Sequence, residues 1–367
     1  MLKNRTHIVG IGGGTGLSIL LVGLKRQLAR RHDLRLSPAE ISAIVSVADD
    51  GGSSGLLRQS FDIPAVGDLR NCIVALAQGN QMWSRLFQHR FEGDSGLSGH
   101  ALGNLIMTAL VQRSGGLSAA ISQLGRALRL RGRIFPVTED RVSLHAACDD
   151  GTVVHGESKI PRAGRRVTKV WLDPARPAPA AGVLETLAAA DAIVLGPGSL
   201  YTSLLPNLLV EGVAETIRES QALRIFVCNL MTQPGETEGF DALDHLRVVE
   251  SYLGAGAVDV CVINGRSVPG AAAARCLALG AEEVRWSSAA LARAGTLPIV
   301  ADLLMPDQFP NRHDPERLAD VILCLARGLH RRRHDGAREP LALDLEAGAP
   351  EPAPPWPPRA VQVAAEG

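Results

Sequence analysis

The chain has 367 residues, and its 38 basic side chains balance 38 acidic ones, so the formal net charge is zero. This balance argues against a protein that holds nucleic acid by bulk electrostatics, because that mode of binding needs a net basic surface. Hydrophobic residues make up 46% of the sequence, which is enough to bury a sizeable core and excludes a disordered chain. No apolar run approaches the ~18 residues of a membrane-spanning helix.

The amino terminus and the cysteines predict a soluble, cytoplasmic protein. The segment Met1–His7 is polar and leads directly into an apolar run, so it lacks the pattern of a signal peptide. No two cysteines form a CxxC pair, and we expect small, reduced, buried side chains. The cysteines are Cys72, Cys148, Cys228, Cys261, Cys276 and Cys324.

Short apolar runs alternate with amphipathic helical patterns along most of the chain. Such runs are typical of parallel strands that are covered on both faces. We expect strands at His7–Ile11, Ile41–Ala48, Ala192–Leu195, Arg224–Asn229 and Val258–Ile263. Leucine-rich helical faces lie within 17–28, 102–110, 117–128 and 318–329. The alternation predicts an α/β fold with a doubly wound, mostly parallel sheet and helices on both faces.

One region departs from this alternation. Val142–Cys148 and Thr152–Gly156 flank Asp149-Asp150-Gly151, and Asp-Gly between two β-rich runs indicates a hairpin. We therefore expect a small antiparallel β lobe at 131–172.

The lobe would divide one α/β domain into an N-terminal part, 1–130, and a remainder, 173–330. Residues 331–367 begin with three arginines and are rich in proline, which predicts a disordered tail. A polyproline segment that docks to a partner protein is the alternative for this tail.

A glycine-rich loop follows the first predicted strand and directly precedes the first predicted helix. Glycines let a backbone approach a phosphate closely, and a helix N-terminus offers free N–H groups and a partial positive charge. This context favours nucleotide or phosphate binding over a structural turn. The candidate residues are Gly12, Gly13, Gly14, Thr15 and Gly16. The loop lacks the lysine of a P-loop, which excludes ATP hydrolysis of that type.

Two adjacent aspartates, Asp49 and Asp50, end the second predicted strand and precede the glycine-rich stretch Gly51–Gly55. In dinucleotide-binding folds a carboxylate at this position meets the ribose hydroxyls. Oxygen ligands also suit Mg²⁺, so a cation at Asp49 and Asp50 is a second interpretation. A simple Asp-Gly turn is the third. Because side chains alternate in direction, only one of the two carboxylates easily points into a site.

Polar residues near two further helix starts are candidates for ligand contacts. Gly67–Asn71 precedes a short apolar helix and contributes Asn71. His100 and Asn104 are four residues apart and share one helical face. His100 is a candidate base, with a capping or structural histidine as the alternative.

Glycines and hydroxyl-bearing residues also follow two later strands. Gly196–Ser203 forms a second candidate anion cradle, which includes Gly198 and Ser199. Asn229–Thr237 follows the next strand and contributes Asn229 and Thr232. Glycine loops after separate strands suit a ligand whose phosphates and second moiety lie across the carboxyl edge of the sheet.

Long strings in the chain resemble the gluconeogenesis factor family, whose relatives include 2-phospho-L-lactate transferase. The strings occur in family order and cover roughly residues 7–330. They are GGGTG at Gly12–Gly16, VADDGGSSG at Val47–Gly55, GDLRN at Gly67–Asn71, LFQHRF at Leu86–Phe91, GHALGN at Gly99–Asn104, DGTVVHGESKIP at Asp150–Pro161, LGPGSLYTSLLPNLLV at Leu195–Val210, CNLMTQPGET at Cys228–Thr237 and NRHDPERLA at Asn311–Ala319.

The resemblance implies a Rossmann-like fold and a nucleotide ligand. In the gluconeogenesis factor branch the implied ligand is a UDP-sugar such as UDP-N-acetylglucosamine. The implied role is regulatory and concerns cell shape and growth on gluconeogenic carbon sources. The phosphates would then lie on Gly12–Gly16 and Gly198–Ser199, the ribose or base near Asp49 and Asp50, and Arg312 on the distal side.

Two other functions are alternatives. The transferase branch moves a phospholactyl group from a guanosine diphosphate donor to a deazaflavin alcohol. In that case Asp49 or Asp50 would hold Mg²⁺, and His100 would join them as a catalytic candidate. A nicotinamide oxidoreductase is suggested only by the glycine loop.

The sequence departs from the family pattern at three positions. Ala101 replaces the serine of GHSLGN, and Leu56 replaces an arginine. Cys276 stands where the family has a tyrosine that would stack on the nucleotide sugar. Loss of such a platform would cost about 1–3 kcal/mol by analogy with base stacking. Besides this ligand we expect unidentified protein partners, no nucleic acid, and a homodimer as the default for a soluble α/β protein.

Overall fold

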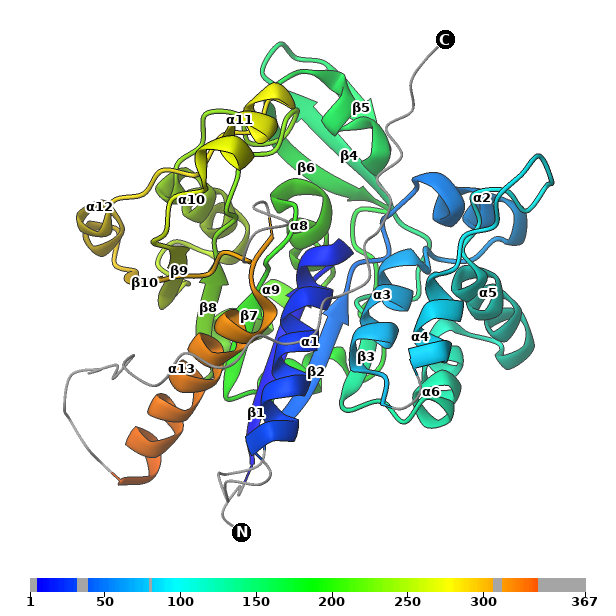
Figure 1. Cartoon of the computed structure of the whole chain (residues 1–367), viewed down its shortest axis with the longest axis horizontal. Coiled ribbons are helices and arrows are strands. Elements are labelled where there is room, and N and C mark those ends of the chain that lie inside the picture. Colours follow the sequence, from blue (N-terminus) through cyan, green and yellow to red (C-terminus); the bar gives the residue numbers. More distant parts are fainter. Residues whose placement is uncertain (1–4, 32–38, 79–80, 306–311, 336–367) are drawn as a thin grey trace.

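Parallel strands form the central sheet of the computed structural model, which describes residues 5–31, 39–78, 81–305 and 312–335 (Figure 1). Seven described strands belong to it, and every neighbouring pair is parallel. In spatial order they are β10 (Leu297–Ala301), β9 (Val260–Asn264), β8 (Leu223–Val227), β7 (Ala192–Leu195), β1 (Thr6–Gly12), β2 (Ala39–Val45) and β3 (Arg133–Pro136). The predicted α/β fold with a mostly parallel sheet is confirmed.

The strand order reverses beside β1. Strands β2 and β3 lie on one side of β1, and the later strands β7, β8, β9 and β10 lie on its other side. In open α/β sheets this reversal makes the carboxyl ends of the two central strands, here β1 and β7, the usual place for a ligand.

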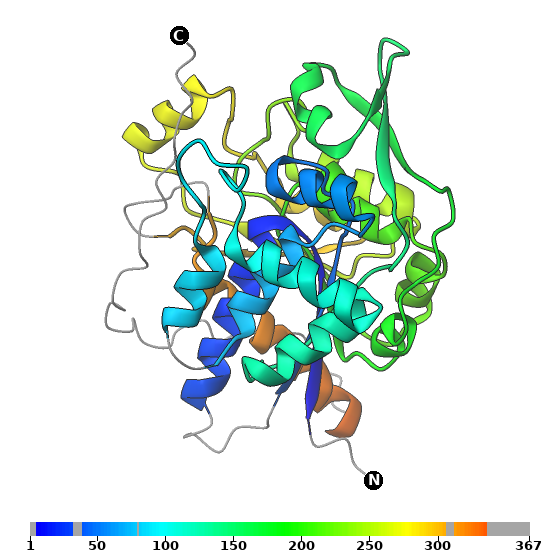
Figure 2. The ribbon, with the colours of Figure 1, turned by 90° about the vertical axis from the view of Figure 1, so that its right-hand side faces the viewer.

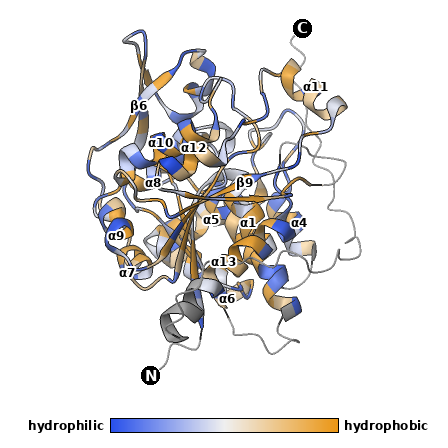
Figure 3. Cartoon of the chain, turned by 90° about the vertical axis from the view of Figure 1, so that its left-hand side faces the viewer, coloured by the Kyte–Doolittle hydropathy of each residue, from blue (hydrophilic) through white to orange (hydrophobic). Residues whose placement is uncertain are grey.

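Helices cover both faces of the sheet, and the view in Figure 3 looks between these two layers. On one face α1 (Gly14–Arg31) packs against α3 (Gly67–Leu76) and α13 (Pro315–Asp335). The opposite face carries α7 (Val183–Ala188), α8 (Leu205–Leu208), α9 (Val213–Glu219) and α10 (Ala242–Leu253). None of the described helices is both long and apolar enough to cross a lipid bilayer.

The remaining helices surround the ends and one side of the sheet. Figure 2 faces the side on which α2 and α5 lie. These helices are α2 (Gly52–Phe61), α4 (Gln81–Gln88), α5 (Leu102–Ser114), α6 (Leu117–Ala127), α11 (Gly270–Ala278) and α12 (Ser288–Arg293).

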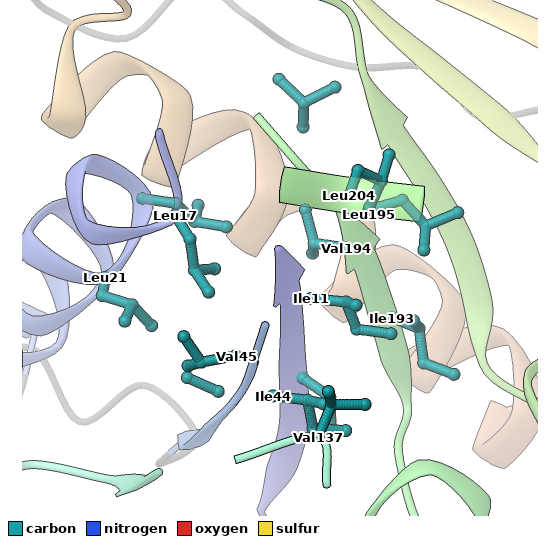
Figure 4. Packing of buried hydrophobic residues seen from close by; sticks show 14 of the residues in the cluster. Ile11, Leu17, Leu21, Ile44, Val45, Val137, Ile193, Val194, Leu195 and Leu204 are labelled. Atoms are coloured by element: carbon teal, nitrogen blue, oxygen red, sulfur yellow. The ribbon is translucent and has the colours of Figure 1, made fainter. Parts of the chain in front are cut away.

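The core lies between the central strands and the helices on either side (Figure 4). Ile11 of β1, Ile44 of β2 and Val194 of β7 are fully buried, as is Leu17 of α1. Each such side chain contributes about 1.5–3 kcal/mol by leaving water. These strands are mostly apolar because helices cover both faces, and this explains why they appear as apolar runs in the sequence.

A second sheet forms the antiparallel lobe. It contains β4 (Ser143–Cys148) between β5 (Val153–His155) and β6 (Val167–Asp173). Gly151 has a φ of +83° in the turn between β4 and β5, so the hairpin predicted at Asp149-Asp150-Gly151 is confirmed.

The lobe begins later than the predicted 131–172. Arg133–Pro136 is β3, which pairs in parallel with β2 at the edge of the main sheet. Ile134 of this short strand is buried, and four residues are too few to reveal their sheet by periodicity.

The helical region at the carboxyl end extends further than expected. The helix α13 continues to Asp335, so residues 331–335 belong to it and not to the tail predicted at 331–367. Arginine has a high helix propensity, so Arg331, Arg332 and Arg333 can continue the helix that the leucine-rich segment begins. The rest of the predicted tail lies outside the described residues. Five of the six cysteines are buried, as expected, and Cys324 is partly exposed.

The contact between α1 and α13 generates a test of the packing. A Cβ on Gly23 of α1 would overlap the carbonyl oxygen of Pro315, whereas a Cβ on Gly328 of α13 meets nothing within 4 Å. Gly23→Ala should therefore lower the free energy of unfolding by about 1–3 kcal/mol. Gly328→Ala should leave it unchanged or raise it by about 0.5–1 kcal/mol, because alanine favours helix. Denaturant unfolding of both variants measures this, and equal effects would contradict the close approach of the two helices.

Candidate functional site

Two glycine loops meet where β1 and β7 end. A Cβ on Gly16 would overlap the carbonyl oxygen of Pro197 and lie 2.8 Å from the Cα of Gly198. Gly14 has a φ of +60° and Gly198 a φ of +153°, and side chains other than glycine rarely adopt such values. The loops Gly12–Gly16 and Gly196–Ser199 therefore pack backbone against backbone.

Asn207 holds the first glycine loop in place through a side-chain hydrogen bond to its backbone. Its Nδ2 donates to the backbone oxygens of Gly12 at 3.2 Å and Ser203 at 2.8 Å, and the side chain is fully buried. It lies in α8, directly after the π-helical turn η4 (Leu200–Leu204). Asn207 lies within the string Leu195–Val210, but its role could not be predicted from the sequence.

A chain of side-chain amides links the second loop to the end of β8. Gln233 Nε2 donates to Ser199 Oγ at 2.7 Å, and Asn229 Nδ2 donates to Gln233 Oε1 at 3.3 Å. Asn229 Oδ1 accepts the N–H of Gly198 at 3.4 Å. The structure thus brings together the predicted residues Gly198, Ser199 and Asn229.

Two other predicted residues near β8 have different surroundings. The hydroxyl of Thr232 accepts the N–H of Glu282 at 2.9 Å, and its own N–H donates to the Glu282 oxygen at 2.7 Å. Arg312 is partly buried and directly precedes His313. Burial lowers the pKa of His313 to about 4, although a hydrogen bond with the backbone of Cys228 opposes the shift. That contact places Arg312 beside the carboxyl end of β8.

Asp49 and Asp68 lie next to the first glycine loop. Asp49 Oδ1 accepts the N–H of Gly51 at 2.8 Å. The N–H of Gly14 donates to the Asp68 carboxyl group, and a Cβ on Gly13 would lie 2.5 Å from Asp68 Oδ2. Burial and the charge of Asp49 raise the pKa of Asp68 to about 7, against the opposing effects of the Gly14 hydrogen bond and Arg70.

The antiparallel lobe adds a third carboxyl group, Glu157, from the turn η2 (Glu157–Lys159). Burial raises its pKa to about 8, and the charges of Asp49, Asp68, Glu236 and Asp50 contribute in that order. At neutral pH the protonated form of Glu157 is therefore favoured, which reduces the repulsion within this group of acids.

Asp50 has a different role from its neighbour. Its Oδ1 accepts the N–H of Ser158 at 2.8 Å, and a Cβ on Gly156 would lie 2.5 Å from its Oδ2. Asp50 thus connects the antiparallel lobe to the end of β2, whereas Asp49 lies beside the first residue of α3. Among the described residues no group of three or more metal-ligating side chains is arranged to hold an ion, and a cation shared by Asp49 and Asp50 would have to compete with these partners.

Glu236 is 3% exposed and lies behind the second loop. Thr202 Oγ1 donates to its Oε1 at 3.3 Å, and the N–H groups of Tyr201 and Thr202 also donate to this carboxyl group. Its Oε2 has no hydrogen-bond partner among the described residues. Burial raises its pKa to about 7 in spite of these donors.

His100, Asn104 and Ser53 form a buried polar group between α2 and α5. Asn104 Nδ2 donates to Ser53 Oγ at 3.0 Å, and Ser53 Oγ lies 3.0 Å from His100 Nδ1. Because Ser53 accepts from Asn104, its own proton is free to go to a neutral His100. These hydrogen bonds are compatible with both predicted roles of His100, the structural histidine and the base. Asn71, on α3, accepts from Arg70 Nη2 at 2.9 Å.

Helix N-termini supply positive potential to the same edge of the sheet. The first turns of α1, α2 and α5 contain no acidic residue. The N-cap positions of α2 and α5, Gly51 and Ala101, provide no side-chain hydrogen bond. Their first N–H groups lack a side-chain cap, and such helix ends attract anions.

Comparison with known proteins identifies the family. The model of the family described as 2-phospho-L-lactate transferase CofD matches residues 8–304. The gluconeogenesis factor of Halalkalibacterium halodurans is 42% identical over 319 residues, which cover 87% of this chain and 96% of the relative. That of Bacillus subtilis is 39% identical over 327 residues, with 88% and 99% covered. The chain belongs to the gluconeogenesis factor family, within the CofD family.

A solved structure agrees with this assignment. A crystal structure of a Bacillus halodurans protein has a TM-score of 0.82 and 42% identity, and the match covers 87% of this chain and 99% of that one.

The three departures from the family pattern occupy distinct environments. Ala101 is the N-cap of α5, so replacement of a family serine removes a capping hydroxyl. Leu56 is 55% exposed on α2. Cys276 is buried in a small apolar cluster with Leu230, Met231, Val268, Ala272 and Leu304. In this member of the gluconeogenesis factor family that position thus contributes to packing.

The pKa of Glu236 predicts a pH-dependent stability. Folding raises this pKa from 4.5 to about 7, so the folded state binds a proton that the unfolded state releases between these pH values. The stabilisation by this group is complete below pH 4.5 and is lost as pH rises through 7. The loss amounts to about 3 kcal/mol.

Glu236→Gln keeps the hydrogen-bond acceptor but not the titration. The decrease in unfolding free energy between pH 5 and pH 8 should therefore be smaller in this variant by about 2.5 kcal/mol, because part of the full loss occurs below pH 5. Denaturant unfolding at both pH values measures it. Equal decreases in the two proteins would show that Glu236 does not titrate as described.

Proposed function

We propose that this protein is a regulatory gluconeogenesis factor that binds a UDP-sugar, such as UDP-N-acetylglucosamine. Its role would concern cell shape and growth on gluconeogenic carbon sources. The relatives named gluconeogenesis factor support the family role. The ligand class rests on one observation, the backbone packing of Gly12–Gly16 against Gly196–Ser199 at the carboxyl ends of β1 and β7.

This packing suits a diphosphate for two reasons. Two glycine loops present backbone without side chains, so two linked phosphates fit across them. The N-termini of α1 and α2 add partial positive charge, and neither has an acidic residue in its first turn.

The nearby carboxyl groups do not prevent this binding. Asp68 and Glu157 have pKa values raised to about 7 and about 8, so both are partly or mostly protonated at neutral pH. A bound diphosphate would favour protonation further, because it adds negative charge nearby. Asp49 would then face the ribose or base of the ligand.

A transferase is the second candidate function. The CofD family match and the closeness of Asp49 to Asp68 favour it. Mg²⁺ is usually held by one or two carboxylates together with substrate phosphates, and it would neutralise charge on a diphosphate. Asp49 and Asp68 would suit this better than Asp49 and Asp50, because both carboxylate oxygens of Asp50 face the lobe, Oδ1 at the N–H of Ser158 and Oδ2 at Gly156.

Thermal unfolding with a panel of ligands separates these functions. The panel contains UDP-N-acetylglucosamine, UDP-glucose, GDP and NAD, each with and without Mg²⁺. A ligand at 100 times its dissociation constant adds about 2.7 kcal/mol. Selective stabilisation by a UDP-sugar that is not consumed supports the regulator. Stabilisation by GDP only with Mg²⁺ supports the transferase, and stabilisation by NAD alone would contradict both.

Thr15 offers a sharper test of the first loop. It is exposed in the first turn of α1, where an added carboxylate favours the helix but repels a bound phosphate. Thr15→Asp should weaken UDP-sugar binding at least tenfold, which corresponds to about 1.4 kcal/mol. The matched variant Thr15→Asn has similar size and no charge and should bind like the wild type. Calorimetric titration measures both, and equal affinities would place the phosphates elsewhere.

A further inference from the structure

The outer face of the antiparallel lobe contains two histidines opposite each other. Along β4 the side chains alternate, so that Leu144, Ala146 and Cys148 are buried and His145 is partly exposed. The strand register pairs His145 with His155 of β5 on one side and with Trp171 of β6 on the other. Directly paired residues on one face lie close enough for their side chains to touch.

The two imidazole rings point their Nδ1 atoms at each other. These atoms are 2.6 Å apart, and the ring centroids are 4.6 Å apart with the planes at 77°. Trp171 stacks on His145 with a centroid distance of 5.7 Å and an interplanar angle of 24°. Only one proton fits between two Nδ1 atoms, so one ring donates and the other accepts.

We propose that His145 and His155 form a site for a divalent transition-metal ion, bound by the Nδ1 atoms of both rings. Imidazole nitrogens suit Cu²⁺, Ni²⁺ and Zn²⁺. The ion takes the place of the shared proton. The ring that carried this proton on Nδ1 becomes the neutral Nε2–H tautomer, because the proton moves through solvent from Nδ1 to Nε2 of the same ring, and water completes the coordination. None of the comparisons assigns a metal to this face.

The distance between the two nitrogens is close to what such an ion needs. Metal–nitrogen bonds of about 2.0–2.1 Å place two ligand atoms roughly 2.9 Å apart in a square-planar site and roughly 3.3 Å apart in a tetrahedral one. The two Nδ1 atoms are 2.6 Å apart, so they need to separate by less than 1 Å, and the rings need to rotate until both lone pairs point at the ion. His155 is exposed at an edge strand, where such a movement meets little resistance.

One carboxylate lies near the histidine pair. The carboxylate of Asp173, on β6, acts electrostatically on His145. The described residues provide no group of three metal ligands, so the site has two protein ligands and open positions. Copper should bind most tightly, because Cu²⁺ has the highest affinity in the series of divalent first-row metals.

The test is calorimetric titration of the purified full-length protein with Cu²⁺ and with Zn²⁺ after removal of metals by a chelator. We expect a saturable binding event that His145→Ala and His155→Gln each weaken at least tenfold and that the double variant lacks. The control is His89→Ala, because His89 is exposed and does not belong to the pair. This variant should bind the metal ion like the wild type. No saturable binding, or binding that the double variant retains, would overturn the proposal.

Trp171 supplies an independent readout. Because its ring stacks on His145, paramagnetic Cu²⁺ at the pair should quench its fluorescence, and Zn²⁺ should not. Trp171→Phe should remove this quenching while the calorimetric event remains. Quenching that persists in the Phe variant would mean that the copper lies near another tryptophan, and the proposal would fail.

Discussion

The contact between the loops after β1 and β7 is the constraint on which the rest of the site depends. Gly16 and Gly198 touch through their backbones, and no larger side chain fits at Gly16 without moving Pro197. This closeness fixes where α1 begins and where its N-terminus points. The Gly12 oxygen accepts hydrogen bonds from the fully buried Asn207 side chain and from the N–H of Ser46. The candidate ligand-binding edge is thus part of the packing of the sheet.

Opposite charges meet at this edge. Three helix N-termini without acidic first turns provide positive potential, while Asp49, Asp68 and Glu157 provide carboxyl groups. Burial raises the pKa of two of these acids into the neutral range. Under the proposed function, protonation of these acids lets the site accept an anion, and its affinity would depend on pH through the same groups. Asp50 connects the lobe to this arrangement through Ser158.

Much of the fold follows from the sequence because central parallel strands are apolar on both faces. Within the parallel sheet, the two strands not predicted from the sequence, β3 and β10, are the edge strands. Each contains a proline, Pro136 and Pro298, which edge strands tolerate and which weakens the strand pattern. The glycine loops were found because a strand, glycines and a helix are adjacent in the chain. Glu157, Glu236 and Asn207 were not assigned roles, because only tertiary packing brings them to the loops.

The most direct test of the account is a crystal structure of the protein with UDP-N-acetylglucosamine. The account predicts that the diphosphate lies across Gly12–Gly16 and Gly196–Ser199, with its oxygens within hydrogen-bond distance of backbone N–H groups of both loops. A diphosphate bound away from the carboxyl ends of β1 and β7 would contradict the central claim.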